Sequence, residues 1–135
     1  MHSNEALFAN EAFYLAFAEG DMEAMDALWS QREQLVCIHP GWAALTGREA
    51  VLESWRSILG NADQPKVSFY GAQALAMDTG SSTVAVVCYE VLPGSVLVAM
   101  NLFVEESGQP RLVHHQSGPC ASPPPLEGGA AILDG

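Results

Sequence analysis

Apolar residues in the first half of the chain recur with the period of an α-helix. Over residues 4–19 they lie three and four positions apart, which predicts an amphipathic helix that ends at Gly20. Asp21 is placed to cap a second helix, whose apolar residues again fall on one stripe. Thr46 and Glu49 have the spacing of a capping box, so we expect a third helix to begin there.

The pattern then changes to runs of β-forming residues separated by turn residues. A short run precedes the third helix and four longer runs follow it; we interpret as strands residues 34–39, 67–77, 83–92, 96–105 and 111–117. The connections between the last four are short, so neighbouring strands are expected to form antiparallel hairpins. We therefore predict an α+β fold in which three N-terminal helices pack on one face of a strongly curved antiparallel sheet.

The end of the chain has a different composition. Residues 120–135 are rich in Pro and Gly, which is typical of an irregular tail. A chain of 135 residues is too short for two ordinary domains. Residues 1–119 are accordingly expected to form a single domain, followed by this tail.

The two central strands of the predicted sheet are apolar on both faces. Residues 84–89 and 96–100 lack the alternation of a strand that has one face in water. Because the helices cover only one face, something else must bury the other. A second copy packed back to back would do so, and we expect a homodimer through the sheet. The alternative, a monomer with an apolar sheet in water, would expose an unusually large patch.

Charge and cysteine content restrict the possible partners. Sixteen acidic residues against five Lys and Arg give a formal net charge of −11, which disfavours binding to nucleic acid or to an anionic membrane. Neither a signal peptide nor a membrane span is indicated, so a cytoplasmic protein is expected. The three cysteines, Cys37, Cys88 and Cys120, have no metal-binding or disulfide spacing, and we expect no metal and no cofactor.

Five short motifs occur in an order that is typical of one superfamily. They are EGDMEA at 19–24, IHPG at 38–41, GREAV at 47–51, NLFV at 101–104 and LVHHQSGP at 112–119. On these motifs, residues 5–119 resemble the SnoaL-like and ketosteroid-isomerase-like branch of the nuclear transport factor 2-like superfamily. The resemblance implies a conical half-barrel with a mostly apolar cavity, usually in a homodimer. Members of the superfamily include isomerases, dehydratases, ligand carriers and protein-binding modules, so the fold alone does not define an activity.

Two positions depart from the isomerase pattern that this resemblance implies. The isomerases have an acidic base where this chain has His39. They also have a carboxylic acid that donates a hydrogen bond near the position of Ala99, and that donor is absent there. The isomerase reaction itself is therefore not predicted.

Three polar residues in apolar surroundings are candidates for acid–base catalysis. His39 ends its strand at the expected cavity mouth and is the first candidate for proton transfer. His115 lies on the strand face that the resemblance turns toward the cavity. Asn101 is the one polar residue of its apolar run and could orient a ligand oxygen. The alternative is structural: Asn101 hydrogen-bonded to His115, and both histidines satisfied in the core.

Aromatic residues could form a wall for a flat or apolar ligand, although plain core packing is the alternative. The predicted ligand-binding residues are Tyr14, Phe17, Trp42, Trp55, Tyr89 and Ser117. The predicted function is the binding of a small hydrophobic molecule, with acid–base catalysis of an isomerase, dehydratase or cyclase type. The alternative is a non-catalytic ligand carrier or a dimeric protein-interaction module.

Overall fold

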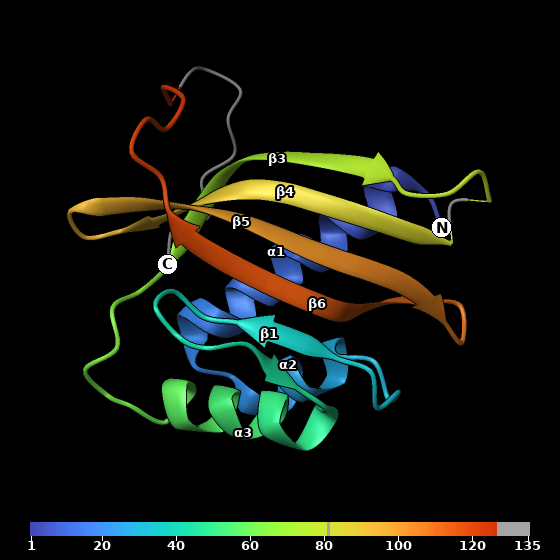
Figure 1. Cartoon of the computed structure of the whole chain (residues 1–135), viewed down its shortest axis with the longest axis horizontal. Coiled ribbons are helices and arrows are strands. Elements are labelled where there is room, and N and C mark those ends of the chain that lie inside the picture. Colours follow the sequence, from blue (N-terminus) through green and yellow to red (C-terminus); the bar gives the residue numbers. More distant parts are fainter. Residues whose placement is uncertain (81, 127–135) are drawn as a thin grey trace.

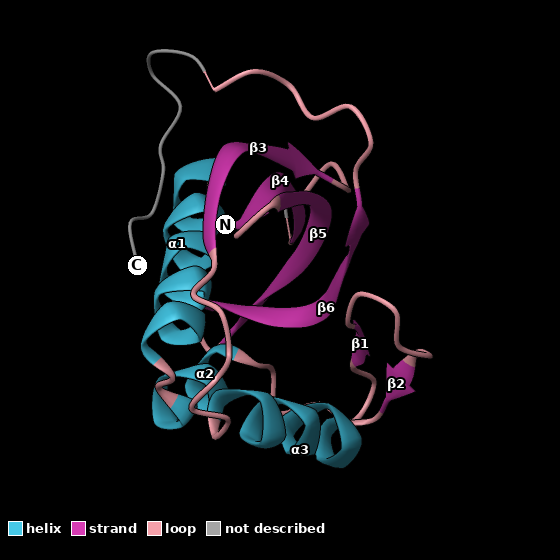
Figure 2. Ribbon diagram, turned by 90° about the vertical axis from the view of Figure 1, so that its left-hand side faces the viewer, coloured by secondary structure: helices cyan, strands magenta, loops and turns pink. Residues whose placement is uncertain are grey.

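The computed structural model describes residues 1–80 and 82–126, and shows three helices packed against a curved six-stranded sheet (Figure 1). The helices are α1 (Ser3–Glu19), α2 (Met22–Leu28) and α3 (Arg48–Leu59). The strands are β1 (Val36–Ile38), β2 (Leu45–Thr46), β3 (Ser68–Ala76), β4 (Thr83–Leu92), β5 (Ser95–Glu106) and β6 (Gln109–Pro119). Figure 2 shows that the sheet is strongly curved and open, with α1 lying along its concave side. Among the described residues, no helix is long and apolar enough to cross a membrane.

The joint between α1 and α2 confirms the prediction from the sequence. Gly20 ends α1 in the left-handed conformation, with φ of 66°, which glycine adopts without strain. The Asp21 side chain then accepts a hydrogen bond from the Ala24 amide at 3.0 Å and caps α2.

The predicted capping box of α3 is wrong. The residue that precedes the helix is Gly47, and no side chain caps it. Thr46 belongs instead to the two-residue strand β2, where it pairs with Val36 of β1. Gly47 follows with φ of 92° and ψ of 145°, a conformation that is almost exclusive to glycine, and this turns the chain from β2 into α3.

The sheet is mixed rather than antiparallel throughout. Strands β3 to β6 form the predicted antiparallel meander. Strand β1, however, pairs parallel to β6, with Val36 opposite His114, and the strand order is β2-β1-β6-β5-β4-β3. The predicted fold of three helices on a curved sheet is confirmed, and the parallel pairing of β1 is an addition that short hairpin connections do not predict.

The concave face of the sheet and the helices enclose the core. On β5, Leu97, Ala99, Asn101 and Phe103 share the inward face and are all buried. On the outer face, Val98 of β5 remains 41% exposed.

The segment after β6 contacts the sheet at Tyr70. The Tyr70 hydroxyl donates to the carbonyl oxygen of Pro124 at 2.7 Å. Tyr70 lies opposite Tyr89 in the sheet, and the two rings pack at 5.5 Å. The division into a domain of residues 1–119 and a tail of residues 120–135 stays a prediction, and residues 127–135 lie outside the described residues.

Replacement of Gly47 tests the turn into α3. We expect Gly47→Ala to lower the free energy of unfolding by about 1–3 kcal/mol, because alanine is strained at this φ and ψ. Gly118→Ala is the matched control, since Gly118 has no positive φ and a β-carbon there would meet nothing within 4 Å. Urea unfolding of both variants measures the difference. Equal stabilities would contradict the role of Gly47.

Candidate functional site

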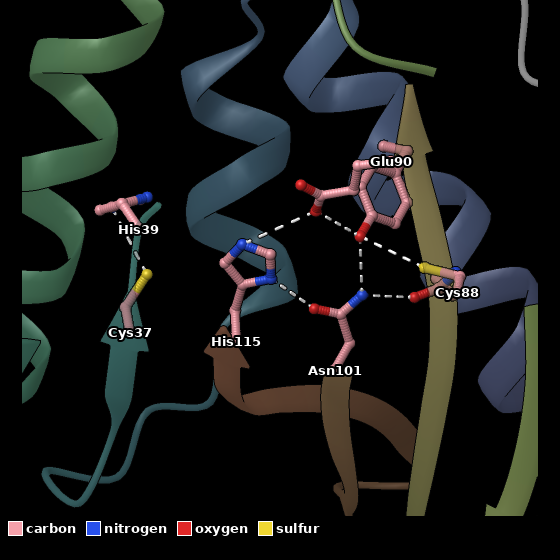
Figure 3. Close-up of polar contacts among 8 residues, drawn as sticks. Cys37, His39, Cys88, Glu90, Asn101 and His115 are labelled. Atoms are coloured by element: carbon pink, nitrogen blue, oxygen red, sulfur yellow. Dashed lines mark hydrogen bonds and ion pairs between the residues drawn. The ribbon is translucent and has the colours of Figure 1, made fainter. Parts of the chain in front are cut away.

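A group of polar side chains is buried between α1 and the concave face of the sheet. This interior polar cluster consists of Asn10, Tyr14, Cys88, Glu90, Asn101 and His115, each at most 3% exposed. Burial of so many polar groups in an apolar core is costly unless they are hydrogen-bonded to one another. The cluster therefore requires a network, and Figure 3 shows the one that forms.

The sheet register brings the cluster together. Asn101 on β5 lies directly opposite His115 on β6, and both side chains point to the concave face. On β4, Cys88 and Glu90 are two residues apart and therefore share that face. Across the core, Tyr14 lies one helical turn after Asn10, so both project from the same side of α1.

Asn101 determines the direction of the hydrogen bonds. Its amide nitrogen donates to Asn10 Oδ1 at 2.8 Å and to the Tyr14 hydroxyl oxygen at 3.2 Å. Its amide oxygen lies 2.5 Å from His115 Nδ1. Because an amide oxygen can only accept, His115 carries a proton on Nδ1, and in the neutral ring Nε2 then holds the lone pair.

Glu90 is the end point of this network. The Tyr14 hydroxyl donates to Glu90 Oε2 at 2.7 Å. The same oxygen lies 3.9 Å from His115 Nε2, on the side of the ring that faces away from Asn101 (Figure 3). This separation is too long for a direct hydrogen bond, and it is wide enough for one bridging oxygen atom.

Burial shifts the protonation of both groups toward their neutral forms. Burial raises the pKa of Glu90, while the nearby hydroxyls of Tyr14 and Ser117 oppose the shift. Burial lowers the pKa of His115 to about 3, and His39 and His114 add to the effect. At neutral pH, His115 is therefore an uncharged base, beside a carboxyl group that keeps its proton to higher pH than an exposed one.

His39 lies in a separate group of contacts. Its Nε2 is 2.9 Å from Ser54 Oγ, whose own proton goes to the carbonyl oxygen of Val51 at 2.7 Å. Ser54 must therefore accept, and His39 carries its proton on Nε2. Burial lowers the pKa of His39 to about 4. The sulfur of Cys37 is 3.5 Å from the same nitrogen, and burial raises the pKa of that thiol to about 12.

Of the three predicted catalytic residues, the structure brings two together. Asn101 and His115 share a hydrogen bond, so the structural contact considered as an alternative is present. His39 joins neither, and its ring centre is 6.3 Å from that of His115. The fully buried ring of Trp55 packs against both histidines, at 4.9 Å and 5.7 Å.

The other predicted ligand-binding residues are more dispersed. Tyr14 belongs to the interior polar cluster. Phe17 is half-buried and packs edge-on against Trp55. Trp42 is 47% exposed and covers one side of the His39 ring. Tyr89 lies on the outer face of the sheet against Tyr70, away from the cluster.

Ser117, the last of the predicted set, points into the core. Its hydroxyl is among the buried polar atoms of the described chain that have no hydrogen-bond partner, although it lies close enough to lower the pKa of Glu90. An enclosed cavity of ligand size beside it stays a prediction. In the described ranges, no group of three or more His, Cys, Asp or Glu residues is arranged to hold a metal ion.

Glu90 was not predicted as a site residue. Position 99 of β5 holds alanine and no carboxylic acid, yet Glu90 supplies a buried carboxyl group from the neighbouring strand β4. A signal was present: Glu90 is the one charged residue in β4, and it follows Val84, Val86 and Cys88 on the inward face. Asn10 and Cys88 were missed as cluster members too, because their partners are far away in sequence.

The lowered pKa of His115 predicts a pH dependence of stability. The unfolded chain binds a proton at this histidine below about pH 6.5 and the folded chain only near pH 3, so this residue makes stability fall as pH decreases between these values. We expect His115→Gln to reduce the slope by up to about 1.4 kcal/mol per pH unit. Urea unfolding at pH 6.0, 5.5 and 5.0 measures it. Parallel curves for the two proteins would contradict a neutral His115.

Comparison with known proteins places this architecture in a family. Residues 7–122 match the SnoaL-like domain. A putative dehydratase of the NTF2-like family from Streptomyces avermitilis is 27% identical, with 89% of this chain and 96% of that chain covered and a TM-score of 0.77. A putative calcium/calmodulin-dependent protein kinase type II association domain from Thiobacillus denitrificans is 29% identical, with coverage of 83% and 92% and a TM-score of 0.69.

More distant structures share the fold alone. An uncharacterized protein with a cystatin-like fold from Caulobacter vibrioides is 13% identical, with coverage of 87% and 88% and a TM-score of 0.75. No curated protein matched the chain. Three helices on a curved, open sheet and a match over residues 7–122 agree: this chain belongs to the SnoaL-like family of the nuclear transport factor 2-like superfamily.

Proposed function

We propose that the interior polar cluster binds a small molecule and catalyses an acid–base reaction, with dehydration as the reaction that it fits best. The observation that carries this proposal is the facing pair of Glu90 and His115, 3.9 Å apart in the core. Burial raises the pKa of Glu90, which favours it as a proton donor, and lowers the pKa of His115, whose Nε2 then holds a free lone pair at neutral pH. An acid and a base poised in this way, and shielded from water, are what general acid–base catalysis requires.

Each residue then has a defined role. Glu90 gives a proton to the leaving hydroxyl group, the C–O bond breaks with its electron pair on oxygen, and water departs. His115 Nε2 takes the proton from the adjacent carbon, and the C–H electron pair becomes the new double bond. Transfer of that proton from His115 to Glu90 restores the starting state. Asn101 is a positioning residue, because its hydrogen bond keeps the lone pair of His115 on Nε2.

The comparison with the Streptomyces avermitilis structure supports this choice among acid–base reactions. That protein is a putative dehydratase, and it covers nearly the whole chain at 27% identity. His39 has no role in the proposed step, since its proton is directed to Ser54 and its contacts lie outside the cluster.

A second candidate function is a dimeric interaction module without catalysis. The apolar outer face of the sheet favours it: Val98 is 41% exposed and Leu75 is 48% exposed. The similarity to a kinase association domain points in the same direction. We include a homodimer through this face in the proposal, together with a cytoplasmic location, with which the free cysteines are consistent.

Two conservative variants test the catalytic proposal. We expect Glu90→Gln and His115→Gln each to lower kcat by about 10²–10⁴-fold, since each removes the proton donor or acceptor. Turnover of a panel of uncharged β-hydroxy ketones and esters is followed by the ultraviolet absorbance of the conjugated product. Ser54→Ala is the control, because the Ser54 hydroxyl contacts His39 and the Val51 carbonyl oxygen and no residue of the cluster. Unchanged kcat in either Gln variant would exclude that residue from the step.

The dimer is tested separately. We expect Val98→Lys to shift the protein from dimer to monomer, because it places a charge on the proposed interface. Sedimentation at several concentrations compares it with the wild type, and Trp42→Lys serves as a control at an exposed site off the sheet. A wild-type monomer, or a variant that stays dimeric, would refute an interface at this face.

A further inference from the structure

At one level of the sheet, the inward side chains of three neighbouring strands are all small. Cys88 of β4 lies opposite Ala99 of β5, and Ala99 lies opposite Ser117 of β6. All three are buried on the concave face. This row of small side chains contrasts with the large rings of Phe13, Tyr14 and Trp55 in the same core.

Around this row lie polar atoms that the hydrogen-bond network of the interior polar cluster leaves available for a further hydrogen bond. His115 precedes Ser117 on the same face of β6, and Glu90 follows Cys88 on the same face of β4. The gap of 3.9 Å between Glu90 Oε2 and His115 Nε2 therefore lies beside the row. Ser117 is only 9% exposed, and its hydroxyl has no hydrogen-bond partner among the residues that the structure describes.

A buried hydroxyl without a partner is unusual, because leaving it unpaired is costly. Here it stands beside an acid and a base that are themselves too far apart to bond. One additional oxygen atom could contact Glu90 and His115 together at ordinary hydrogen-bond lengths. One added oxygen atom could therefore form hydrogen bonds with Glu90, His115 and Ser117 together.

We infer that the row of small side chains is a subsite for the hydroxyl group of an uncharged ligand, held by Glu90, His115 and Ser117. This inference rests on the proposed function and names its substrate class, an uncharged β-hydroxy carbonyl compound. On binding, a hydroxyl group accepts from the carboxyl of Glu90 and donates to the lone pair of His115 Nε2. For the C–H step, the hydroxyl proton turns to Ser117 Oγ, which frees that lone pair. A carbonyl oxygen can only accept, and would set its own lone pair against that of the ring.

The charge of the surroundings selects an uncharged ligand. The protein has a formal net charge of −11, and none of its five Lys and Arg residues belongs to the cluster or the row. An anionic ligand would have no positive partner there. The β-hydroxy carbonyl class follows from the chemistry, because the carbonyl acidifies the C–H bond next to the carbon that bears the hydroxyl. Because the acid Glu90 and the base His115 lie close together, they would remove H and OH from the same face of the substrate.

The test compares three matched probes on the full chain: 3-hydroxycyclohexanone, 3-methoxycyclohexanone and cyclohexanone. We expect the hydroxy compound to bind at least about tenfold more tightly than the other two, as measured by NMR titration of the labelled protein. Ser117→Ala should reduce this preference several-fold without loss of stability, since its hydroxyl has no partner to lose. Ala99→Val should abolish it by filling the row. Val98→Ala, on the outer face of the same strand, is the control and should leave it unchanged.

The outcomes separate this inference from the proposed function. Equal affinity for the three probes, no binding of any of them, or a preference that survives both Ser117→Ala and Ala99→Val would overturn the subsite. Conversion of 3-hydroxycyclohexanone to cyclohex-2-enone is followed in the same samples. A hydroxyl preference without turnover leaves the subsite standing and counts against dehydration. Turnover without a hydroxyl preference does the reverse.

Discussion

The side chain of Asn101 holds the interior of this protein together. It bonds to Asn10 and Tyr14 of α1 and to His115 of β6, so one residue of the central strand connects the helix to the sheet. Both hydrogens of its amide nitrogen are donated, one to Asn10 and one to Tyr14. The position of the free lone pair on His115 and the donor that reaches Glu90 both follow from this arrangement.

The polar interior has an energetic consequence for the fold. Burial in an apolar core raises the pKa of the Glu90 carboxyl and lowers the pKa of the His115 imidazole, because ionisation there is unfavourable. An all-apolar core of the same shape would avoid this constraint. The chain instead keeps a proton donor and a proton acceptor at a fixed distance, which is easier to explain by chemistry than by stability. The outer face of the sheet carries a different kind of surface, which is apolar and half-exposed around Val98.

Local sequence signals predicted much of the fold. Apolar periodicity located the three helices, and the family resemblance turned the His115 side of the last strand toward the interior, where the structure has it. Pairings between distant segments were harder to predict. Strand β1 pairs in parallel with β6, which lies far away in the sequence. Nothing local to residues 36–38 specifies that partner. The start of α3 was misplaced because the torsion angles of Gly47 outweighed a side-chain cap.

The candidate site was predicted only in part, for a related physical reason. His115 and Asn101 stand out as polar residues in apolar strands, whereas Glu90 lies near the end of β4, where a charged residue usually faces water. Its burial depends on Tyr14, which is 76 positions away in the sequence and supplies its hydrogen bond. Alternation along β4 does place Glu90 on the inward face. The local pattern does not reveal the hydrogen-bond partner that a buried carboxyl group needs.

One of the three cysteines is suited to site-specific labelling of this chain. Cys37 and Cys88 are buried, and burial raises the pKa of each thiol to about 12, so neither is reactive at neutral pH. Cys120 is partly exposed, and its amide donates to the carbonyl oxygen of Val96 at the edge of β5. A maleimide dye would therefore attach at one position of the unmodified protein. Its emission would report whether the segment after β6 stays docked on the sheet when a partner or a ligand arrives.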